Sequence, residues 1–304
     1  MKIVITGGAG FIGSHLATEL IRKKHQVKII DDLSTGTLEN LSGVKNKIDF
    51  KLGDIKNFNF LRQEFLGEDV LFHLAAKILV GESVKYPKLY HQVNATGTLN
   101  VLLAARQAKI KKVIIASSCA VYGDSRQQKI KETQVLNPAS PYALTKMISE
   151  NYGLMFSRLY QLPVIILRYF NVYGQPWPAK SNYAAVITTF RDQLSKKQPA
   201  IIYGNGRQTR DFIYVDDVVT ANLCALRAPD TANGQIFNIG SGKATTIIDL
   251  YQLMAKIMGQ SHRQPIFKPE RAGNIHYSCA DISKAKKILN YQPQINLANG
   301  LKKI

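Results

Sequence analysis

The first 170 residues alternate short apolar runs with longer amphipathic segments. Short runs rich in β-branched side chains predict strands, and apolar residues at helical spacing predict helices between them. The strands are expected at 2–6, 27–30, 48–52, 70–75, 113–117 and 164–168, and the helices at 11–24, 59–65, 89–108 and 142–160.

Uniformly apolar strands indicate a sheet that is covered on both faces, and the strand–helix alternation indicates parallel βαβ units. The pattern therefore predicts an α/β fold with a doubly wound, Rossmann-type parallel sheet over residues 1–170. After Arg168 the pattern loosens into a Pro/Gly-rich loop and short mixed elements. We expect a smaller mixed α/β lobe over residues 171–304, with some of its segments returning to the sheet.

A glycine-rich turn, TGGAGFIG, joins the first predicted strand to the first helix, and it places Gly7, Gly10 and Gly13 three residues apart. Such glycines let the backbone approach a pyrophosphate, which the helix N-terminus then faces. Asp31 and Asp32 end the second strand, where a carboxylate accepts hydrogen bonds from ribose hydroxyls and repels a 2′-phosphate. This arrangement predicts NAD as the cofactor. The alternative is a plain glycine turn that binds no cofactor.

In the stretch PYALTK, Tyr142 precedes Lys146 by four residues, so both lie on one face of the predicted helix. A nearby ammonium stabilises a phenolate and lowers the tyrosine pKa. Such a tyrosine can take a proton from a hydroxyl while hydride leaves the same carbon. Ser118, at the end of the fifth strand, is expected to hold the substrate oxygen. An ordinary surface pair, and a serine that only satisfies the strand end, are the alternatives.

Composition narrows the class of protein. The 304 residues are 45% hydrophobic, enough for a large core, and no run approaches the about 18 apolar residues of a membrane span. The net charge of +19 is spread over separated lysine pairs, which favours a solvated surface over a nucleic-acid partner. Three widely spaced cysteines and the absence of a secretion signal predict a cytoplasmic protein, and six scattered histidines predict no metal site.

Several longer motifs extend over nearly the whole chain. They are TGGAGFIGSHL, DDLSTG, GDI at 53–55, HLAA at 73–76, SSCAVYG, PYALTK, RYFNVYG at 168–174, YGNGRQTRDFIYVDDV at 203–218 and FNIGSG at 237–242. In this order they resemble the extended short-chain dehydrogenase/reductase family, and within it the NAD-dependent nucleotide-sugar epimerases and dehydratases. The resemblance implies a UDP-hexose 4-epimerase activity or a closely related one.

By that resemblance the catalytic residues are Ser118, Tyr142 and Lys146. The residues implied to bind NAD are Gly7, Gly10, Phe11, Ile12, Gly13, Asp31, Asp32, Ser34, Gly36, Asp54, Ile55, Leu74, Ala75, Ala76, Asn94, Tyr142, Lys146 and Phe170. Those implied to bind the UDP-sugar are Ser118, Asn171, Tyr203, Arg210, Arg271 and Ser278. Structural ion pairs with Asp211 or Glu270 are the alternative for the two arginines.

Two positions bear on the reaction and the sugar. Dehydratases of the family carry Asp-Glu where this chain has Cys119 and Ala120, so dehydration is not expected. Galactose-only epimerases can carry a tyrosine where Ser278 falls, and a small side chain there would leave room for an N-acetyl group. We therefore expect UDP-GlcNAc and UDP-GalNAc to be accepted beside UDP-glucose and UDP-galactose. An alignment shifted by one residue would place Tyr277 there.

The family resemblance also implies a homodimer, in which the helices around 86–108 and 142–160 pair across a two-fold axis. Packing of those helices within one chain is the alternative. Two other functions stay open: a UDP-glucuronate 4-epimerase or decarboxylase, and a non-enzymatic RNA-binding protein of the same fold. Only the net charge of +19 suggests the second.

Overall fold

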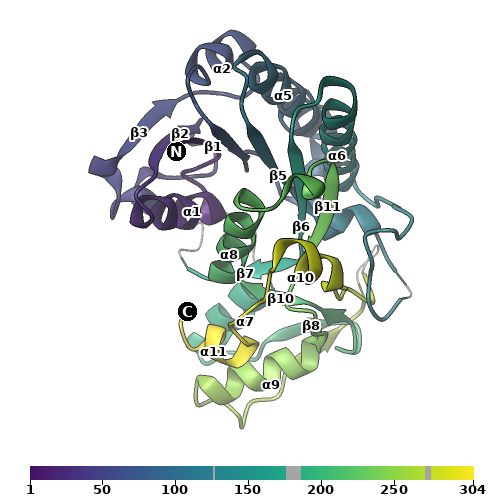
Figure 1. Cartoon of the computed structure of the whole chain (residues 1–304). Coiled ribbons are helices and arrows are strands. Elements are labelled where there is room, and N and C mark those ends of the chain that lie inside the picture. The colour runs from purple at the N-terminus through teal and green to yellow at the C-terminus, as the bar shows by residue number, and fades with distance from the viewer. Residues whose placement is uncertain (126, 176–185, 271–274) are drawn as a thin grey trace.

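The structure is a computed structural model that describes residues 1–125, 127–175, 186–270 and 275–304. Its centre is a seven-stranded parallel sheet with the order β11-β6-β5-β4-β1-β2-β3 (Figure 1). The strands are β1 (Lys2–Thr6), β2 (Gln26–Asp31), β3 (Ile48–Leu52), β4 (Val70–His73), β5 (Lys112–Ser118), β6 (Val164–Tyr169) and β11 (Gln235–Ile239). The predicted Rossmann-type fold is confirmed, and each of the six predicted strands is present.

Helices cover both faces of this sheet (Figure 1). One face carries α1 (Phe11–Arg22) and α8 (Val215–Leu226), and the other carries α2 (Phe58–Glu64), α5 (Gly97–Gln107) and α6 (Pro141–Tyr160). In β1, Ile3 and Ile5 enter the core beneath α1 and α8, whereas Val4 enters the opposite core. This alternation explains why the strands are apolar at every position.

The predicted helix at 89–108 is divided. It consists of α4 (Pro87–Tyr90), a π-helical turn η3 (His91–Thr96) and α5, and it follows the short helix α3 (Val80–Lys85). The helix predicted at 142–160 is continuous. It begins at Pro141, where the side chain of Ser140 accepts a hydrogen bond from the Ala143 N–H (3.2 Å).

Smaller paired strands and further helices make up the lower part of the molecule in Figure 1. Its pairs are β7 (Asn171–Tyr173) with β10 (Phe212–Tyr214), β8 (Ile201–Tyr203) with β13 (Ile266–Lys268), and β9 (Thr209–Arg210) with β12 (Thr245–Thr246). Its helices are α7 (Val186–Ser195), α9 (Ile247–Ile257) and α11 (Leu297–Leu301), whereas α10 (Ser283–Leu289) packs against α8 and against β11 of the central sheet. Within the described residues the 3₁₀ turns are η1 (Leu38–Leu41), η2 (Lys45–Lys47), η4 (Cys119–Tyr122) and η5 (Asp230–Ala232).

The chain does not separate cleanly at residue 170. Both α8 and β11 follow that position, yet α8 packs on the sheet beside α1, and β11 pairs in register with β6. A core of its own, which includes Phe190 of α7 and Leu250 of α9, supports the smaller lobe. The division into 1–170 and 171–304 stays a prediction.

Candidate active site

The turn after β1 packs backbone against backbone. Gly7 has a φ of +75°, and a Cβ there would lie 2.6 Å from the backbone nitrogen of Ala75. A Cβ on Gly36 would lie 2.7 Å from the carbonyl carbon of Ala9. Gly10 precedes α1 in an extended conformation, without a side-chain cap, and the first turn of α1 carries no acidic residue. No side chain therefore caps the first N–H groups of α1 or neutralises the positive end of the helix dipole. The turn fits the pyrophosphate of a dinucleotide, because those N–H groups can bind its phosphate oxygens.

The two predicted aspartates differ in environment. Asp31 is buried, and its carboxylate accepts hydrogen bonds from the backbone N–H of Ala9 and of Leu33, at 2.9 and 2.8 Å. Burial raises the pKa of Asp31, and the two backbone hydrogen bonds oppose that shift. Asp32 is exposed and accepts from the Ser34 N–H (2.9 Å). Asp31 thus fixes the glycine turn, while Asp32 presents a carboxylate to solvent at the same strand end.

Most of the predicted cofactor residues come together at one edge of the sheet. Because the strands are parallel, their carboxyl ends meet there, which is where open α/β sheets bind ligands. The segments that directly follow β1 to β4 hold Gly7, Gly10, Phe11, Ile12, Gly13, Asp32, Ser34, Gly36, Asp54, Ile55, Leu74, Ala75 and Ala76. Phe170 directly follows β6 and is buried, with its ring tilted on Tyr122 at a centroid distance of 6.4 Å.

Asn94 lies in the π-helical turn and is fully buried. Its side-chain amide donates to the carbonyl of Lys77 (2.9 Å) and to Thr145 Oγ1 (3.0 Å), and its Oδ1 accepts from the Lys77 N–H (2.8 Å). Asn94 therefore connects the segment after β4 with α6. Such π-helical turns are frequent at functional sites.

Tyr142 and Lys146 lie on α6, and both are buried, at 8% and 7% exposure. Lys146 Nζ donates to the carbonyl of Ala116 (2.9 Å), two residues before Ser118 on β5. Ser118 is half-buried and caps η4 by accepting from the Ala120 N–H (3.2 Å). Burial lowers the pKa of Lys146 to about 8, against the opposing charge of Glu150. The first turn of α6 and the end of β5 are thus held together through Lys146.

Three of the predicted substrate residues, Asn171, Tyr203 and Arg210, lie on the short strands β7, β8 and β9. Asn171 donates from Nδ2 to the carbonyl of Asp211 (3.0 Å), and Arg210 donates from Nη1 to the carbonyl of Ile275 (2.7 Å). Burial lowers the pKa of Arg210. Tyr203 ends β8 and is half-exposed. Arg271 lies outside the described residues.

Asp211 is a buried anchor that the sequence analysis considered only as an ion-pair partner. Its carboxylate accepts from the backbone N–H of Ser241 (2.7 Å), Gly242 (3.0 Å) and Ala280 (3.0 Å). These contacts fasten the loop after β11 and the segment after Ser278 to β9 and β10. Asp211 therefore holds the segment of Ser278 and the loop after β11 beside Arg210, the residue that precedes it.

Ser278 faces the end of β5. It is buried, at 5% exposure, whereas the side chain of Tyr277 is 47% exposed. Burial raises the pKa of Cys119 to about 11, and a side-chain hydrogen bond with Ser278 partly offsets this shift. Ser278 therefore lies against the residue that directly follows Ser118, and Tyr277 points elsewhere.

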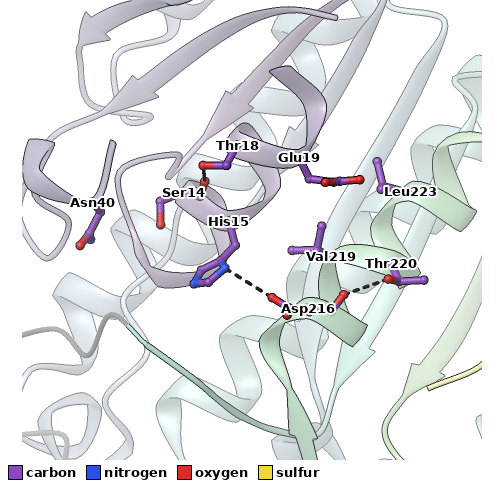
Figure 2. A pocket seen from close by; sticks show the side chains of 9 residues that line it. All are labelled: Ser14, His15, Thr18, Glu19, Asn40, Asp216, Val219, Thr220 and Leu223. Carbon is purple, nitrogen blue, oxygen red and sulfur yellow. Dashed lines mark hydrogen bonds and ion pairs between the residues drawn. The ribbon is translucent and has the colours of Figure 1, made fainter. Parts of the chain in front are cut away.

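A separate groove of about 510 Å³ lies between α1 and α8 (Figure 2). Its lining includes His15 and Asp216, whose side chains face each other across the groove, with Nδ1 of His15 3.7 Å from Oδ1 of Asp216. None of the predicted catalytic residues lines it.

Two further observations concern the described ranges only. Their His, Cys, Asp and Glu side chains form no cluster that could hold a metal. Their helices are too short or too polar to cross a membrane.

Glu150 and Arg168 form a buried ion pair directly beneath this site, and neither is among the predicted site residues. Glu150 lies one helical turn after Lys146, and that spacing is a signal present in the sequence. It is a weak signal, because a charged residue on a helix is usually exposed.

Comparison with known proteins gives a consistent result. The model of the family described as "NAD dependent epimerase/dehydratase family" matches residues 3–240. A UDP-glucose 4-epimerase from Mycolicibacterium smegmatis is 39% identical, with 100% of this chain and 97% of that protein covered.

Solved structures are similar over the whole fold. A UDP-N-acetylglucosamine 4-epimerase from Methanobrevibacter ruminantium, in complex with UDP-N-acetylmuramic acid, has a TM-score of 0.93 at 36% identity, over 99% of this chain and 96% of that one. A UDP-glucuronic acid 4-epimerase from Bacillus cereus, in complex with UDP-glucuronic acid and NAD, has a TM-score of 0.92 at 32% identity, over 100% and 97%. The chain therefore belongs to the NAD-dependent epimerase/dehydratase family, and it is an enzyme whose cofactor is NAD.

Proposed function

We propose that the protein is a UDP-hexose 4-epimerase that interconverts UDP-glucose and UDP-galactose and also accepts their N-acetylated counterparts. The observation that carries the proposal is the burial of Tyr142 and Lys146 on one face of α6, with Lys146 Nζ bonded to β5 two residues before Ser118. The similarity to 4-epimerases of three UDP-sugars supports the reaction type.

In the proposed mechanism, Tyr142 as its phenolate removes the proton of the sugar C4 hydroxyl. Ser118 hydrogen-bonds the same oxygen, and the Lys146 ammonium stabilises the phenolate. NAD, when bound, would supply a reversible two-electron acceptor for the C4 hydride. The 4-ketosugar, tethered by its diphosphate, turns over, so that the hydride would come back on the opposite face of the sugar. Tyr142 then gives the proton back to the 4-keto oxygen, so that the sugar is inverted at C4 and no external oxidant or reductant is consumed.

The residues that would hold NAD follow from the strand ends. The turn around Gly7 and Gly10 would take the pyrophosphate, and Asp31 or Asp32 would take the adenosine ribose. Asp54 and Ile55 would border the adenine. For the substrate, Asn171, Arg210 and Arg271 would hold the diphosphate, and Tyr203 would stack on the uracil, since guanidinium groups suit phosphates and aromatic faces suit bases.

A panel of UDP-sugars tests this function. The purified protein, with NAD added, is incubated separately with UDP-glucose, UDP-GlcNAc and UDP-glucuronate, and products are identified by NMR. We expect the C4 epimer from the first two. Release of CO₂, or an epimer from UDP-glucuronate alone, would replace the proposal with one of its rivals. Salt-sensitive RNA binding without turnover of any sugar would favour the non-enzymatic alternative.

Ser278 is proposed to set the room beside the sugar at C2. The Ser278→Tyr variant is expected to lower kcat/KM for UDP-GlcNAc at least about tenfold more than for UDP-glucose, because a larger side chain fills that room. Tyr277→Ser is the matched control, since Tyr277 is exposed, and it should leave the ratio of the two sugars unchanged. An unchanged ratio in Ser278→Tyr would show that another residue limits the pocket.

We further propose a homodimer built on α6. Along this helix Leu144, Ile148, Met155 and Leu159 are exposed or half-exposed at helical spacing. Leu144 and Leu159 are 44% and 59% exposed. A row of exposed apolar side chains is the usual mark of a protein interface.

A charge in this row is expected to separate the dimer. Leu159→Glu should shift the mass measured by light scattering from two chains toward one at micromolar concentration, because an unpaired carboxylate would be buried at the interface. The control is Leu52→Glu on the edge strand β3, where the leucine is 66% exposed. A wild-type protein that runs as a monomer would reject the proposal.

The cellular compartment is proposed to be the cytoplasm. Cys119, Cys224 and Cys279 are free thiols, as expected under reducing conditions. Cell fractionation with antibody detection tests this, and recovery of the protein only outside the cytoplasm would contradict it.

A further inference from the structure

A buried ion pair connects α6 to the sheet directly behind the candidate active site. Glu150 and Arg168 are both 2% exposed. Arg168 Nε donates to Glu150 Oε1, and Arg168 Nη2 donates to Glu150 Oε2, both at 2.7 Å. Ser117, next to Ser118 on β5, donates from Oγ to Glu150 Oε1 (2.5 Å). One carboxylate thus joins α6 to the ends of both β5 and β6.

The contacts continue past Arg168 into the turn that Ser118 caps. Arg168 Nη1 donates to the hydroxyl of Tyr122 in η4 (2.7 Å), and that hydroxyl donates to Asn238 Oδ1 on β11 (2.7 Å). The guanidinium also lies over the Tyr122 ring, 4.7 Å from its centroid. The carboxylate, the guanidinium and the phenol therefore form one hydrogen-bonded chain from α6 to β11.

Such a chain is not needed for stability alone. Well-packed apolar residues of similar volume often stabilise a core as much as a buried ion pair, or more, because burying the charges is costly. What an ion pair with two parallel hydrogen bonds adds is a fixed orientation. Here the ion pair fixes the orientation of α6, which carries Tyr142 and Lys146, relative to β6.

We propose that Glu150 and Arg168 are positioning residues, whose ion pair fixes α6 against the ends of β5 and β6 and so holds the candidate catalytic side chains in place. The proposal rests on the proposed epimerase function. Neither residue touches the substrate; both act through Lys146, Tyr142 and Ser118.

The charges around Lys146 make the effect measurable. Lys146 faces Tyr142 and Glu150 on its own helix and the neutral, buried His73 on β4, and Arg168 on β6 lies behind Glu150. Glu150 favours the charged form of Lys146, while burial disfavours it. Loss of the Glu150 charge, with Arg168 left in place, therefore lowers the pKa of Lys146.

The first test is Glu150→Gln, which keeps the shape of the side chain and removes its charge. We expect kcat for the best UDP-sugar of the panel to fall about 10- to 100-fold, with KM and bound NAD changed less than about twofold. The basic limb of the kcat–pH profile should move to lower pH by about one unit, because charged Lys146 is lost earlier. NMR of protein labelled with ¹³C at lysine Cε, with Lys146→Arg to assign the signal, follows the same titration without turnover.

The matched control is Glu19→Gln. Glu19 receives the same two parallel hydrogen bonds from Arg22 (2.6 and 2.7 Å), but on the surface of α1, where the Arg22 side chain is 70% exposed. This variant should keep the wild-type kcat and pH profile.

Two further variants separate orientation from charge. The double variant Glu150→Met/Arg168→Met removes both charges, so the basic limb should stay near its wild-type position while kcat remains at least about tenfold low. Arg168→Lys keeps a cation without the parallel hydrogen bonds and should give a kcat between those of the double variant and wild type. Should Glu150→Gln fail to fold, the double variant carries the test.

The outcomes are distinct. A folded Glu150→Gln or double variant with kcat within twofold of wild type would overturn the proposal. In Glu150→Gln, a kcat loss that only follows the loss of folded protein, with an unshifted pH profile, would do the same and leave a purely structural pair. A wild-type protein that turns over no UDP-sugar would instead reject the epimerase function, and the lysine titration would still report on Glu150.

Discussion

Tyr142→Phe is expected to lower kcat by about 100- to 10,000-fold, the usual contribution of a positioned acid–base group. The change removes one buried oxygen and keeps the ring, so α6 and its contacts with β5 should stay intact. NAD should be retained, because the glycine turn that fits its pyrophosphate lies at the end of β1. The measurements are steady-state epimerisation and the amount of NAD released from the purified, denatured protein.

Tyr160→Phe is the matched control for this variant. Tyr160 lies at the other end of the same helix and is 40% exposed, with the Arg106 guanidinium 4.0 Å from its ring centroid. The phenylalanine ring can keep that contact, so kcat should stay within twofold of wild type. A Tyr142→Phe protein that retains more than about a third of the wild-type kcat would show that another group moves the proton.

Gly7→Ala is expected to abolish NAD retention and to lower the free energy of unfolding by about 2–5 kcal/mol. Two causes add. The φ of +75° costs about 1–2 kcal/mol for a residue with a Cβ. That Cβ would also lie 2.6 Å from the Ala75 backbone, which cannot move without displacing the segment after β4. Urea denaturation and the NAD content of the purified protein measure the two effects.

Gly67→Ala separates strain from collision. Gly67 has nearly the same φ, +76°, but no atom lies within 4 Å of a Cβ placed there. Gly67→Ala should therefore lower the free energy of unfolding only by the cost of the positive φ, about 1–2 kcal/mol, and NAD should be retained. If both alanine variants were equally stable and kept equal amounts of NAD, close packing of the glycine turn would not matter for cofactor binding.

Much of the fold was predictable because local sequence patterns, such as apolar runs and glycine spacing, determine its strands, helices and turns. Short β-branched runs such as residues 164–168 favour strands buried on both faces, and the glycine spacing after residue 6 marks the turn into α1. The face shared by Tyr142 and Lys146 follows from helical geometry. Their burial, and the contact of Lys146 with Ala116, agree with that expectation.

The features that the sequence analysis missed depend on distant partners. A π-helical turn at residues 91–96 shifts the hydrogen bonds by one residue within a single turn, which leaves the apolar spacing nearly unchanged. Glu150 resembles a surface residue until β6 is known to lie beneath α6 with Arg168 facing it. Likewise, the partners of Asp211 belong to loops that only the folded chain brings near it.

The pairing of β11 with β6 has a consequence for how this protein unfolds. Every residue of β6 is buried, and β11 supplies its outer hydrogen-bonding partner from the far end of the sequence. In a fragment that ends after residue 170, β6 would be an apolar edge strand with unpaired backbone N–H and C=O groups, which promotes aggregation. We therefore expect that residues 1–170 do not fold independently, and that the whole chain unfolds in one cooperative transition.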